Sequence, residues 1–453
     1  MSRESLDFGT MKVTHLFAKL FFPTFLGLFF YAMLNIADGM FVGQGVGSDA
    51  LAAVNIAAPL YTLATAIGLQ LASGVSIVAA VLLSQGKVAE ARRHVTYAFL
   101  VGTATMAVIC VLIWCLPRPL SFLFGGTEQL YPLVRDYMIW MAPALLFSAI
   151  LVIGMFVLRL EGLPQKAMLC EVVPSIVNLV LDWLLVFPLQ MGVRGAALAT
   201  TLSQALGVGM LVYFMRRHVR TLRVSRLAWS RRAARLMVHD LWHMMQVGFP
   251  AFVGEIAISS IMVTGNYLFV RYLHEDGVAA FSVACYLMPL IFMMGSAIAQ
   301  SLQPIVSYNM GGGHRDRVRQ TLRISCVAAL VSGLLVSALG FFAHRPLLAL
   351  FLEPGSAAYT IATNGFPLYA TSFLFFTLNL VLIGYLQSLK QHRLSTFFML
   401  LRGFLFVMPS FVLLPRLCGA AGLWLAIPLS EMLTCVCLVV TLCFSRRVRV
   451  AKE

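Results

Sequence analysis

Six ionisable side chains lie inside long apolar stretches of the sequence, where a charge is costly. They are Asp38, Glu171, Asp182, Glu255, Arg402 and Glu431. A charged side chain at the centre of a membrane-spanning helix costs about 2.5 to 3.5 kcal/mol on insertion scales, so such residues usually face a bundle interior or a water-filled cavity. These six residues are therefore the first candidates for a functional site.

Two of the six belong to a polar stripe in an otherwise apolar segment. Glu171, Ser175, Asn178 and Asp182 follow one another at spacings of four, three and four residues. This spacing places all four side chains on a single face of an α-helix. Most other residues of the segment are Val, Ile or Leu. The stripe is therefore predicted to point into the protein and away from lipid.

Asp38 is predicted to open on the same cavity as Asp182. A helical rise of 1.5 Å per residue places Asp38 about 35 Å, and Asp182 about 21 Å, from the cytoplasmic ends of their helices. Helix tilt can absorb much of that difference, so both carboxylates fit one cavity in the outer half of the bilayer. Other polar side chains on neighbouring segments add to this cavity: Tyr137, Thr200, Thr201 and Gln204.

Two carboxylates that share a dry site are not both readily ionised, because desolvation and like charge oppose it. Such a pair can take up a proton on one side of a membrane and release it on the other. The oxygens of Asp38, Asp182 and Asn178 could instead coordinate Na⁺. The alternative is that these residues are hydrogen-bonded packing residues, although Asn or Ser would serve that purpose at lower cost.

The second half of the chain carries a different set of charges. Glu255 and Glu431 are its intramembrane acids, and Arg402 is predicted to pair with one of them. For Arg402, a structural ion pair and a functional site are both open interpretations.

The composition indicates a membrane protein. Of 453 residues, 60% are hydrophobic and 11% are charged, whereas about a quarter of the residues in a soluble domain are charged. Twelve apolar runs are long enough to cross a bilayer, for which about 20 residues are needed. They lie at roughly 15-43, 51-83, 95-116, 137-158, 168-189, 195-215, 244-270, 279-309, 324-343, 361-386, 394-415 and 419-444. An all-α polytopic fold is expected, without a removable signal peptide.

The net charge of +15 reflects membrane topology. Most Lys and Arg residues fall at the two termini and in the loops that follow the even-numbered spans, which predicts cytoplasmic termini in the inner membrane. The densest basic run, 216-236, is read as a cytoplasmic linker that contacts anionic lipid, and a nucleic-acid partner is not expected. The nine cysteines are scattered and predict neither disulfides nor a metal site.

The chain contains a weak internal repeat. Pro23 and Gly27 in KLFFPTFLG match Pro250 and Gly254 in VGFPAFVG, and GAALATTLSQ (195-204) matches GLWLAIPLSE (422-431). Each copy has six spans, so the copies have the same orientation in the membrane, an architecture found in transporters that alternate access between two lobes. The predicted domains are an N-terminal lobe (1-215), a basic linker (216-243) and a C-terminal lobe (244-453). The loops 86-95 and 312-321 are predicted to form short amphipathic helices.

Taken together, these features resemble those of the prokaryotic multidrug and toxic compound extrusion (MATE) family. The resemblance rests on D-x-x-F-V-G at 38-43, NLVLDWLLVF, GVRGAALATT and the twelve spans in two parallel bundles. It implies export of amphipathic organic cations by antiport against H⁺ or Na⁺, with no other cofactor. One branch of the family has a coupling motif that falls here on Asp38, Tyr137, Asn178, Asp182 and Thr200 or Thr201. Another branch pairs acids on helices 7 and 10; Glu255 matches the first, but helix 10 has no carboxylate.

Other functions are less consistent with the sequence. A flippase or exporter of lipid-linked saccharides from the same superfamily is the main alternative, although such proteins commonly have extra spans and cationic cavities. The sequence lacks the loop motif of a major-facilitator antiporter, the catalytic cluster of a membrane enzyme and the repeated charges of a channel. We expect a monomeric transporter of small organic cations, not an enzyme.

Overall fold

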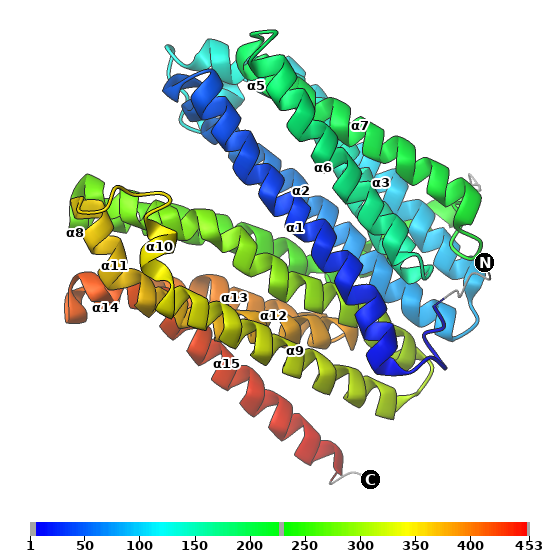
Figure 1. The fold of residues 1–453 in the computed structure, drawn as a ribbon. Helices are drawn as coiled ribbons and strands as arrows, with labels where there is room; N and C mark the ends of the chain where they lie inside the picture. The colour runs from blue at the N-terminus through cyan, green and yellow to red at the C-terminus, as the bar shows by residue number, and fades with distance from the viewer. Residues whose placement is uncertain (1–5, 226–230, 451–453) are drawn as a thin grey trace. The chain divides into compact units, whose positions relative to one another are not determined.

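The computed structural model describes residues 6–225 and 231–450, and every regular element in these ranges is a helix (Figure 1). The first half of the chain forms α1 (Val13–Gly45), α2 (Ser48–Ser84), α3 (Val88–Cys115), α4 (Pro117–Leu123), α5 (Tyr131–Leu160), α6 (Pro164–Val186) and α7 (Gly192–His218). The second half forms α8 (Arg231–Gly311), α9 (Arg315–Phe342), α10 (His344–Leu348), α11 (Ala357–Ala370), α12 (Ser372–Ser388), α13 (His392–Leu400), the π-helical turn η1 (Leu401–Leu405), α14 (Val407–Cys418) and α15 (Ala420–Val450).

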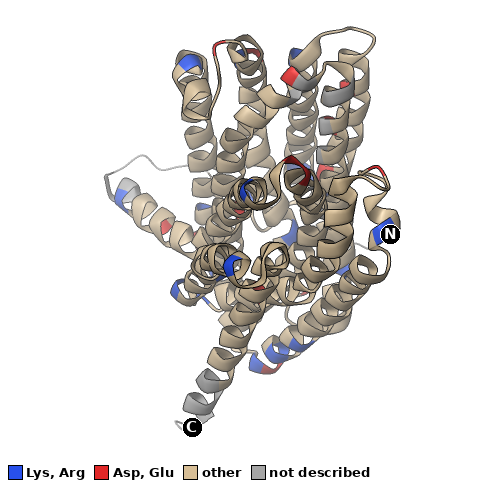
Figure 2. Cartoon of the chain, turned by 90° about the vertical axis from the view of Figure 1, so that its left-hand side faces the viewer, with Lys and Arg blue, Asp and Glu red and all other residues tan. Residues whose placement is uncertain are grey.

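The helices account for the twelve predicted spans. Ten described helical stretches are long and apolar enough to cross a membrane. One of them, α8, joins two helices across a break at His274, where φ is 56° and ψ is −153°. A further span is divided into α11 and α12 by a bend of 40°. Counting α8 as two spans and the bent pair as one gives twelve spans. Long helical stretches carry few charged residues (Figure 2).

The prediction of separate amphipathic helices at 86-95 and 312-321 is wrong. Residues from Val88 and from Arg315 onward form the first turns of α3 and α9, continuous with the spans that follow. Gly86 (φ 74°) and Gly313 (φ 78°) adopt the left-handed conformation that ends the preceding helix. The charged residues therefore extend the membrane helices instead of forming helices of their own.

The chain divides into two compact units. Unit 1 comprises Met1–Glu255 and Gln303–Val318, and unit 2 comprises Ile256–Leu302 and Arg319–Glu453. Unit 1 thus includes both ends of α8 as well as α1 to α7. The lobe boundaries predicted from the repeat stay a prediction, because these units are defined by packing.

Small residues allow the helices of unit 1 to pack closely. A Cβ on Gly154 of α5 would overlap the side chain of Leu211 on α7, and one on Gly207 would lie 2.9 Å from atoms of Leu151 and Pro174. On α1, a Cβ at Gly27 would lie 2.5 Å from the Glu171 carboxylate of α6. These close approaches hold α6, which carries the polar stripe, between α1, α5 and α7.

In unit 2 the core is aromatic. The rings of Phe269 and Phe281 stack at 4.4 Å between centroids, and Trp424 meets Phe269 edge to face at 5.0 Å. Tyr369 closes the cluster, at 6.4 Å from Trp424. Residues far apart in sequence thereby connect α8, α11 and α15.

Candidate functional site

The polar stripe of α6 faces the interior of unit 1. Ser175, Asn178 and Asp182 are 6%, 1% and 0% exposed. On the opposite face, Val180 is 57% and Trp183 is 54% exposed, as expected for side chains that contact lipid. The helical spacing therefore predicted the buried face of this helix correctly.

The carboxylates of Asp38 and Asp182 form the centre of the candidate site. Asp38 lies on α1 and Asp182 on α6, two helices that pack along each other (Figure 1). The charge of Asp38 acts on Asp182, and the charges of both act on Tyr137 of α5. Tyr137 is 6% exposed. The structure thus brings three of the predicted site residues into one neighbourhood.

Several polar atoms of this site are buried without a hydrogen bond. Among the described residues, both carboxylate oxygens of Asp182, Oδ1 of Asp38 and Nδ2 of Asn178 have no hydrogen-bond partner. Buried polar side chains almost always have a partner, so each exception requires a physical explanation. Two like charges in a medium of low dielectric constant also repel strongly. A proton or a monovalent cation held between the two carboxylates would relieve both penalties.

The threonines of α7 have a different set of contacts. Thr201 Oγ1 donates to the carbonyl oxygen of Trp140 at 2.7 Å and so ties α7 to α5. Thr200 Oγ1 donates to the Ala196 carbonyl oxygen one turn earlier, at 3.1 Å. These described hydrogen bonds run to the backbone and not to either carboxylate. Each of the two hydroxyl oxygens can still accept a hydrogen bond through its lone pairs. Gln204, in the next turn of α7, is partly buried.

Glu171 belongs to a separate charge pair. Its charge and that of Arg159 on α5 act on each other, and Arg159 is only 4% exposed. The Arg159 guanidinium also lies over the ring of Phe156, at 5.2 Å from the centroid. The sequence analysis missed Arg159 because it follows an apolar run directly, at a position where a basic residue normally marks the membrane surface.

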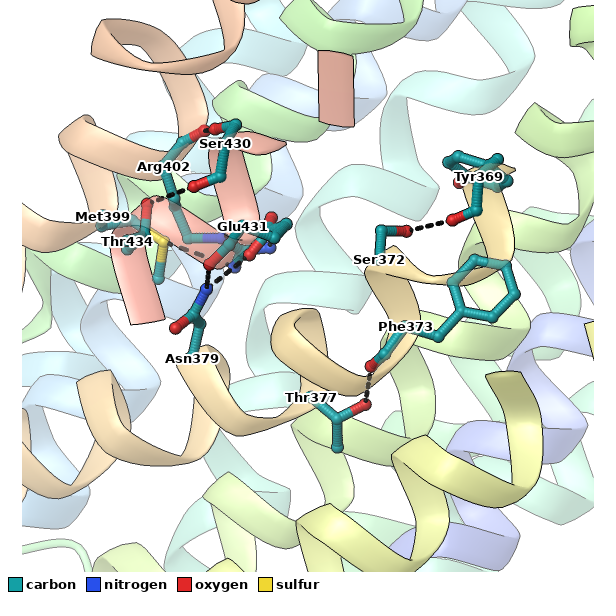
Figure 3. Close-up of polar contacts among 10 residues, drawn as sticks. All are labelled: Tyr369, Ser372, Phe373, Thr377, Asn379, Met399, Arg402, Ser430, Glu431 and Thr434. Atoms are coloured by element: carbon teal, nitrogen blue, oxygen red, sulfur yellow. Dashed lines mark hydrogen bonds and ion pairs between the residues drawn. The ribbon is translucent and has the colours of Figure 1, made fainter. Parts of the chain in front are cut away.

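Unit 2 contains a buried ion pair between Arg402 and Glu431 (Figure 3). The Nη2 and Nε atoms of Arg402 donate to Glu431 Oε1 at 2.7 and 3.0 Å. Asn379 Nδ2 donates to the other carboxylate oxygen of Glu431 at 2.7 Å and to its carbonyl oxygen at 2.8 Å. Of the two partners that the sequence left open for Arg402, the structure selects Glu431.

The backbone around this ion pair is irregular. Arg402 lies in the π-helical turn η1, a rare conformation that often occurs at functional sites. Ser430 Oγ donates to the carbonyl oxygen of Arg402 at 2.9 Å, and the Phe376 ring lies under the guanidinium at 4.3 Å. Asn379 escaped the sequence analysis, although a strong hydrogen-bonding amide in the apolar run of α12 was a usable signal. Glu255 lies in the first part of α8, is partly buried and takes no part in this cluster.

The comparisons with known proteins identify the family. The MatE family model matches residues 23–184 and again residues 250–412, which together cover well over half of the chain. The chain belongs to the MatE family. The two matches start 227 residues apart, which confirms the internal repeat found in the sequence. As a MatE protein it is a multi-pass membrane transporter and not an enzyme.

Relatives of this MatE transporter differ in the compounds for which they are named. A FAD transporter from Shewanella oneidensis is 26% identical over 91% of this chain and 90% of its own. Multidrug export protein MepA from Staphylococcus saprophyticus is 21% identical over 90% and 89%. A solved outward-facing multidrug resistance MATE transporter of the MOP superfamily is 19% identical, covers 100% of this chain and 99% of its own, and has a TM-score of 0.90. This last likeness confirms the all-α fold of twelve membrane helices.

The described residues contain no group of three or more His, Cys, Asp or Glu side chains that could hold a metal ion. The predicted Na⁺ ligands Asp38, Asp182 and Asn178 comprise two carboxylates and one amide, so this site stays a prediction.

Proposed function

We propose that this MatE transporter exports amphipathic organic compounds, mostly cations, across the inner membrane by antiport against H⁺ or Na⁺. Both termini would be cytoplasmic and the chain would act as a monomer. The observation that carries the proposal is the fully buried Asp182 carboxylate, which has no hydrogen-bond partner among the described residues and lies within the electrostatic reach of Asp38. An uncompensated charge in that position needs a mobile cation.

The proposed coupling step is an exchange at these two carboxylates. A cation entering from outside compensates one of the two negative charges and so removes the repulsion between Asp38 and Asp182, and its release on the cytoplasmic side restores that repulsion. For Na⁺, the Asn178 carbonyl oxygen would add a neutral ligand of the hard type that this ion prefers. For H⁺, the two carboxylates suffice. Tyr137 is proposed to orient the carboxylates. The hydroxyls of Thr200 and Thr201 donate to backbone carbonyl oxygens and are proposed to accept a hydrogen bond from a protonated carboxyl. Gln204 and Glu171 are proposed to occupy supporting positions.

The substrate class rests on relatives. Multidrug export is proposed first, because proteins named for it match nine-tenths of the chain. Export of a flavin nucleotide is the second candidate, because the FAD transporter is the more similar relative at 26% identity. Transport of lipid-linked saccharides stays the more distant alternative.

Efflux from proteoliposomes tests the proposal. Vesicles containing the purified chain are loaded with ethidium or with FAD, and a pH gradient or a Na⁺ gradient is imposed separately. We expect one gradient to drive efflux of wild type and of Asp49→Asn, whose carboxylate is exposed at the start of α2, but not of Asp182→Asn or Asp38→Asn. Efflux of FAD alone would favour the second candidate. Gradient-driven efflux by Asp182→Asn at the wild-type rate would exclude this coupling site.

A further inference from the structure

Helix α2 and the first part of α8 make a contact that only glycine permits. A Cβ on Gly74 of α2 would clash with the carbonyl oxygen of Met244, and one on Gly248 of α8 would clash with the carbonyl oxygen of Gln70. Both obstacles are backbone atoms, which cannot rotate away as a side chain can. All four residues belong to unit 1 and are buried.

A second close contact joins the end of α2 to the end of α8, which lies beyond the break at His274 and belongs to a different span from Gly248. A Cβ on Gly311, the last residue of α8, would clash with Ser84 Oγ at the end of α2 and would lie 3.0 Å from the Val81 backbone. Beside the contact with Gly248, the Gln70 side chain donates to the Met245 carbonyl oxygen at 3.0 Å. We call these contacts of Gln70, Gly74 and Ser84 with Met245, Gly248 and Gly311 the glycine seam.

A strap at the start of the chain lies over the end of α8. This strap, residues 6–12, is held through its carbonyl oxygens: Asn309 Nδ2 donates to Phe8 at 3.0 Å, and Arg317 Nη2 donates to Phe8 and Met11 at 3.0 and 2.6 Å. The rings of Phe8 and Tyr308 lie 5.8 Å apart. Within the strap, hydrogen bonds from the Thr10 hydroxyl and the Gly9 N–H hold the pKa of Asp7 below its usual value.

The seam joins elements from the two sequence repeats. Helix α2 belongs to the first match of the family model, and α8 from residue 250 onward, which includes Gly311, belongs to the second. Met244, Met245 and Gly248 lie directly before that second match. The contact of Ser84 with Gly311 lies where α2 and α8 lead into their basic loops, which start at Lys87 and His314 and are predicted to be cytoplasmic. Gly248 lies five residues after the basic linker 216-243, which is predicted to be cytoplasmic as well. Transporters with repeats alternate access by moving one repeat against the other around the site. A contact that joins the repeats on one side must therefore open when that side admits substrate.

We propose that the glycine seam is the cytoplasmic gate of this transporter, closed by backbone-to-backbone contact at Gly74, Gly248 and Gly311 and latched by Gln70 and the strap. This inference rests on the proposed export function, because a gate is needed only if the repeats move. Glycine is required at the three positions, since any larger residue separates the two helices. Gln70 contributes to the latch one hydrogen bond from a neutral amide, an interaction typically worth only about 1 kcal/mol. The strap contributes three more through its Phe8 and Met11 carbonyl oxygens.

Disulfide trapping tests whether the seam opens. In a chain whose nine native cysteines are replaced, Ser84→Cys and Gly311→Cys would place two thiols on opposite sides of the seam. The control pair is Gly68→Cys with Ala149→Cys, whose Cβ atoms would lie 3.7 Å apart on α2 and α5 of the first repeat, within disulfide reach. We expect oxidation to abolish efflux by the seam pair, reduction to restore it, and the control pair to transport in both states. Full efflux by the oxidised seam pair would overturn the proposal.

A second experiment does not depend on disulfide geometry. Gly248→Ala is compared with Gly209→Ala, because a Cβ on Gly209 meets no atom within 4 Å. In each background the alkylation rate of Ser84→Cys by a maleimide is measured. We expect faster alkylation in Gly248→Ala, whose seam cannot close, and an unchanged rate in Gly209→Ala; equal rates in all backgrounds would contradict the gate. This readout needs no transported compound, so a failure of the gate is distinguishable from a failure of the proposed export function.

Discussion

Arg402 and Glu431 form a buried ion pair inside unit 2, with Nη2 and Oε1 2.7 Å apart and exposures of only 6% and 2% for the two side chains. The repeat spacing of 227 residues aligns Arg402 with Ser175 and Glu431 with Gln204, both neutral. In the first repeat, by contrast, both carboxylate oxygens of Asp182 and Oδ1 of Asp38 are buried without a hydrogen-bond partner among the described residues. Glu431 therefore has a counter-ion supplied by the protein, whereas Asp38 and Asp182 are proposed to bind a transported cation.

The ion pair gives a prediction about stability. Arg402→Met leaves the Glu431 charge buried without its counter-ion, which typically costs about 3 to 5 kcal/mol. The double variant Arg402→Met with Glu431→Leu removes both charges, and we expect most of that loss to be recovered. Thermal unfolding of the detergent-solubilised protein measures both. If the double variant is no more stable than Arg402→Met, the cost lies in the packing over Phe376 and not in the unpaired charge.

A substitution at Asn178 distinguishes the two candidate coupling ions. The Asn178 carbonyl oxygen can coordinate Na⁺, whereas a proton on Asp38 or Asp182 does not need it. We therefore expect Asn178→Ala to raise the Na⁺ concentration for half-maximal efflux if Na⁺ is coupled, and to change proton-driven efflux much less. Ser175→Ala is the matched control, because its hydroxyl donates to the Glu171 carbonyl oxygen at 2.7 Å within the helix. Equal effects of both substitutions would argue against a specific role for the amide.

The apolar runs made the spans predictable, because a bilayer sets their length. The spacing of Ser175, Asn178 and Asp182 likewise predicted which face of α6 is buried, since helical periodicity is a local property. The partner of Arg402 was not predictable, because Glu255 and Glu431 are equally apt by residue type and only helix packing decides between them. For the same reason, the sequence did not reveal Arg159 as the neighbour of Glu171.

The π-helical turn at Arg402 was the other feature missing from the sequence analysis. The hydroxyl of Ser430, on another helix, donates to the carbonyl oxygen of Arg402 within this turn. No proline marks this position in the sequence, so the turn required the tertiary structure. The break at His274, by contrast, falls between the predicted spans 244-270 and 279-309, as expected from the sequence.

Glu161 anchors the start of the linker after α7, and this contact gives a prediction about proteolysis. Its carboxylate accepts hydrogen bonds from three successive backbone N–H groups, those of Arg220, Thr221 and Leu222, at 2.7, 2.7 and 2.9 Å. We expect Glu161→Ala to release this segment and to accelerate tryptic cleavage at Arg220 and Arg223, measured by mass spectrometry. Glu128→Ala, which removes an exposed ion pair with Arg118, should leave that cleavage unchanged. An unaltered cleavage rate in Glu161→Ala would show that Arg92, which binds two carbonyl oxygens of the same segment, is sufficient.

Gly365 packs against Trp424 in the aromatic core of unit 2, and this contact gives a prediction about stability. A Cβ at this position would clash with the indole ring of Trp424, which is 3% exposed and fixed by Phe269 and Tyr369. We expect Gly365→Ala to lower the free energy of unfolding by about 1 to 3 kcal/mol, as overpacking of a dense core does. Trp424 must also shift, so the tryptophan emission spectrum should change with it. Gly209→Ala provides the control without a steric conflict, and a Gly365→Ala variant with wild-type stability would mean that the indole has room to move.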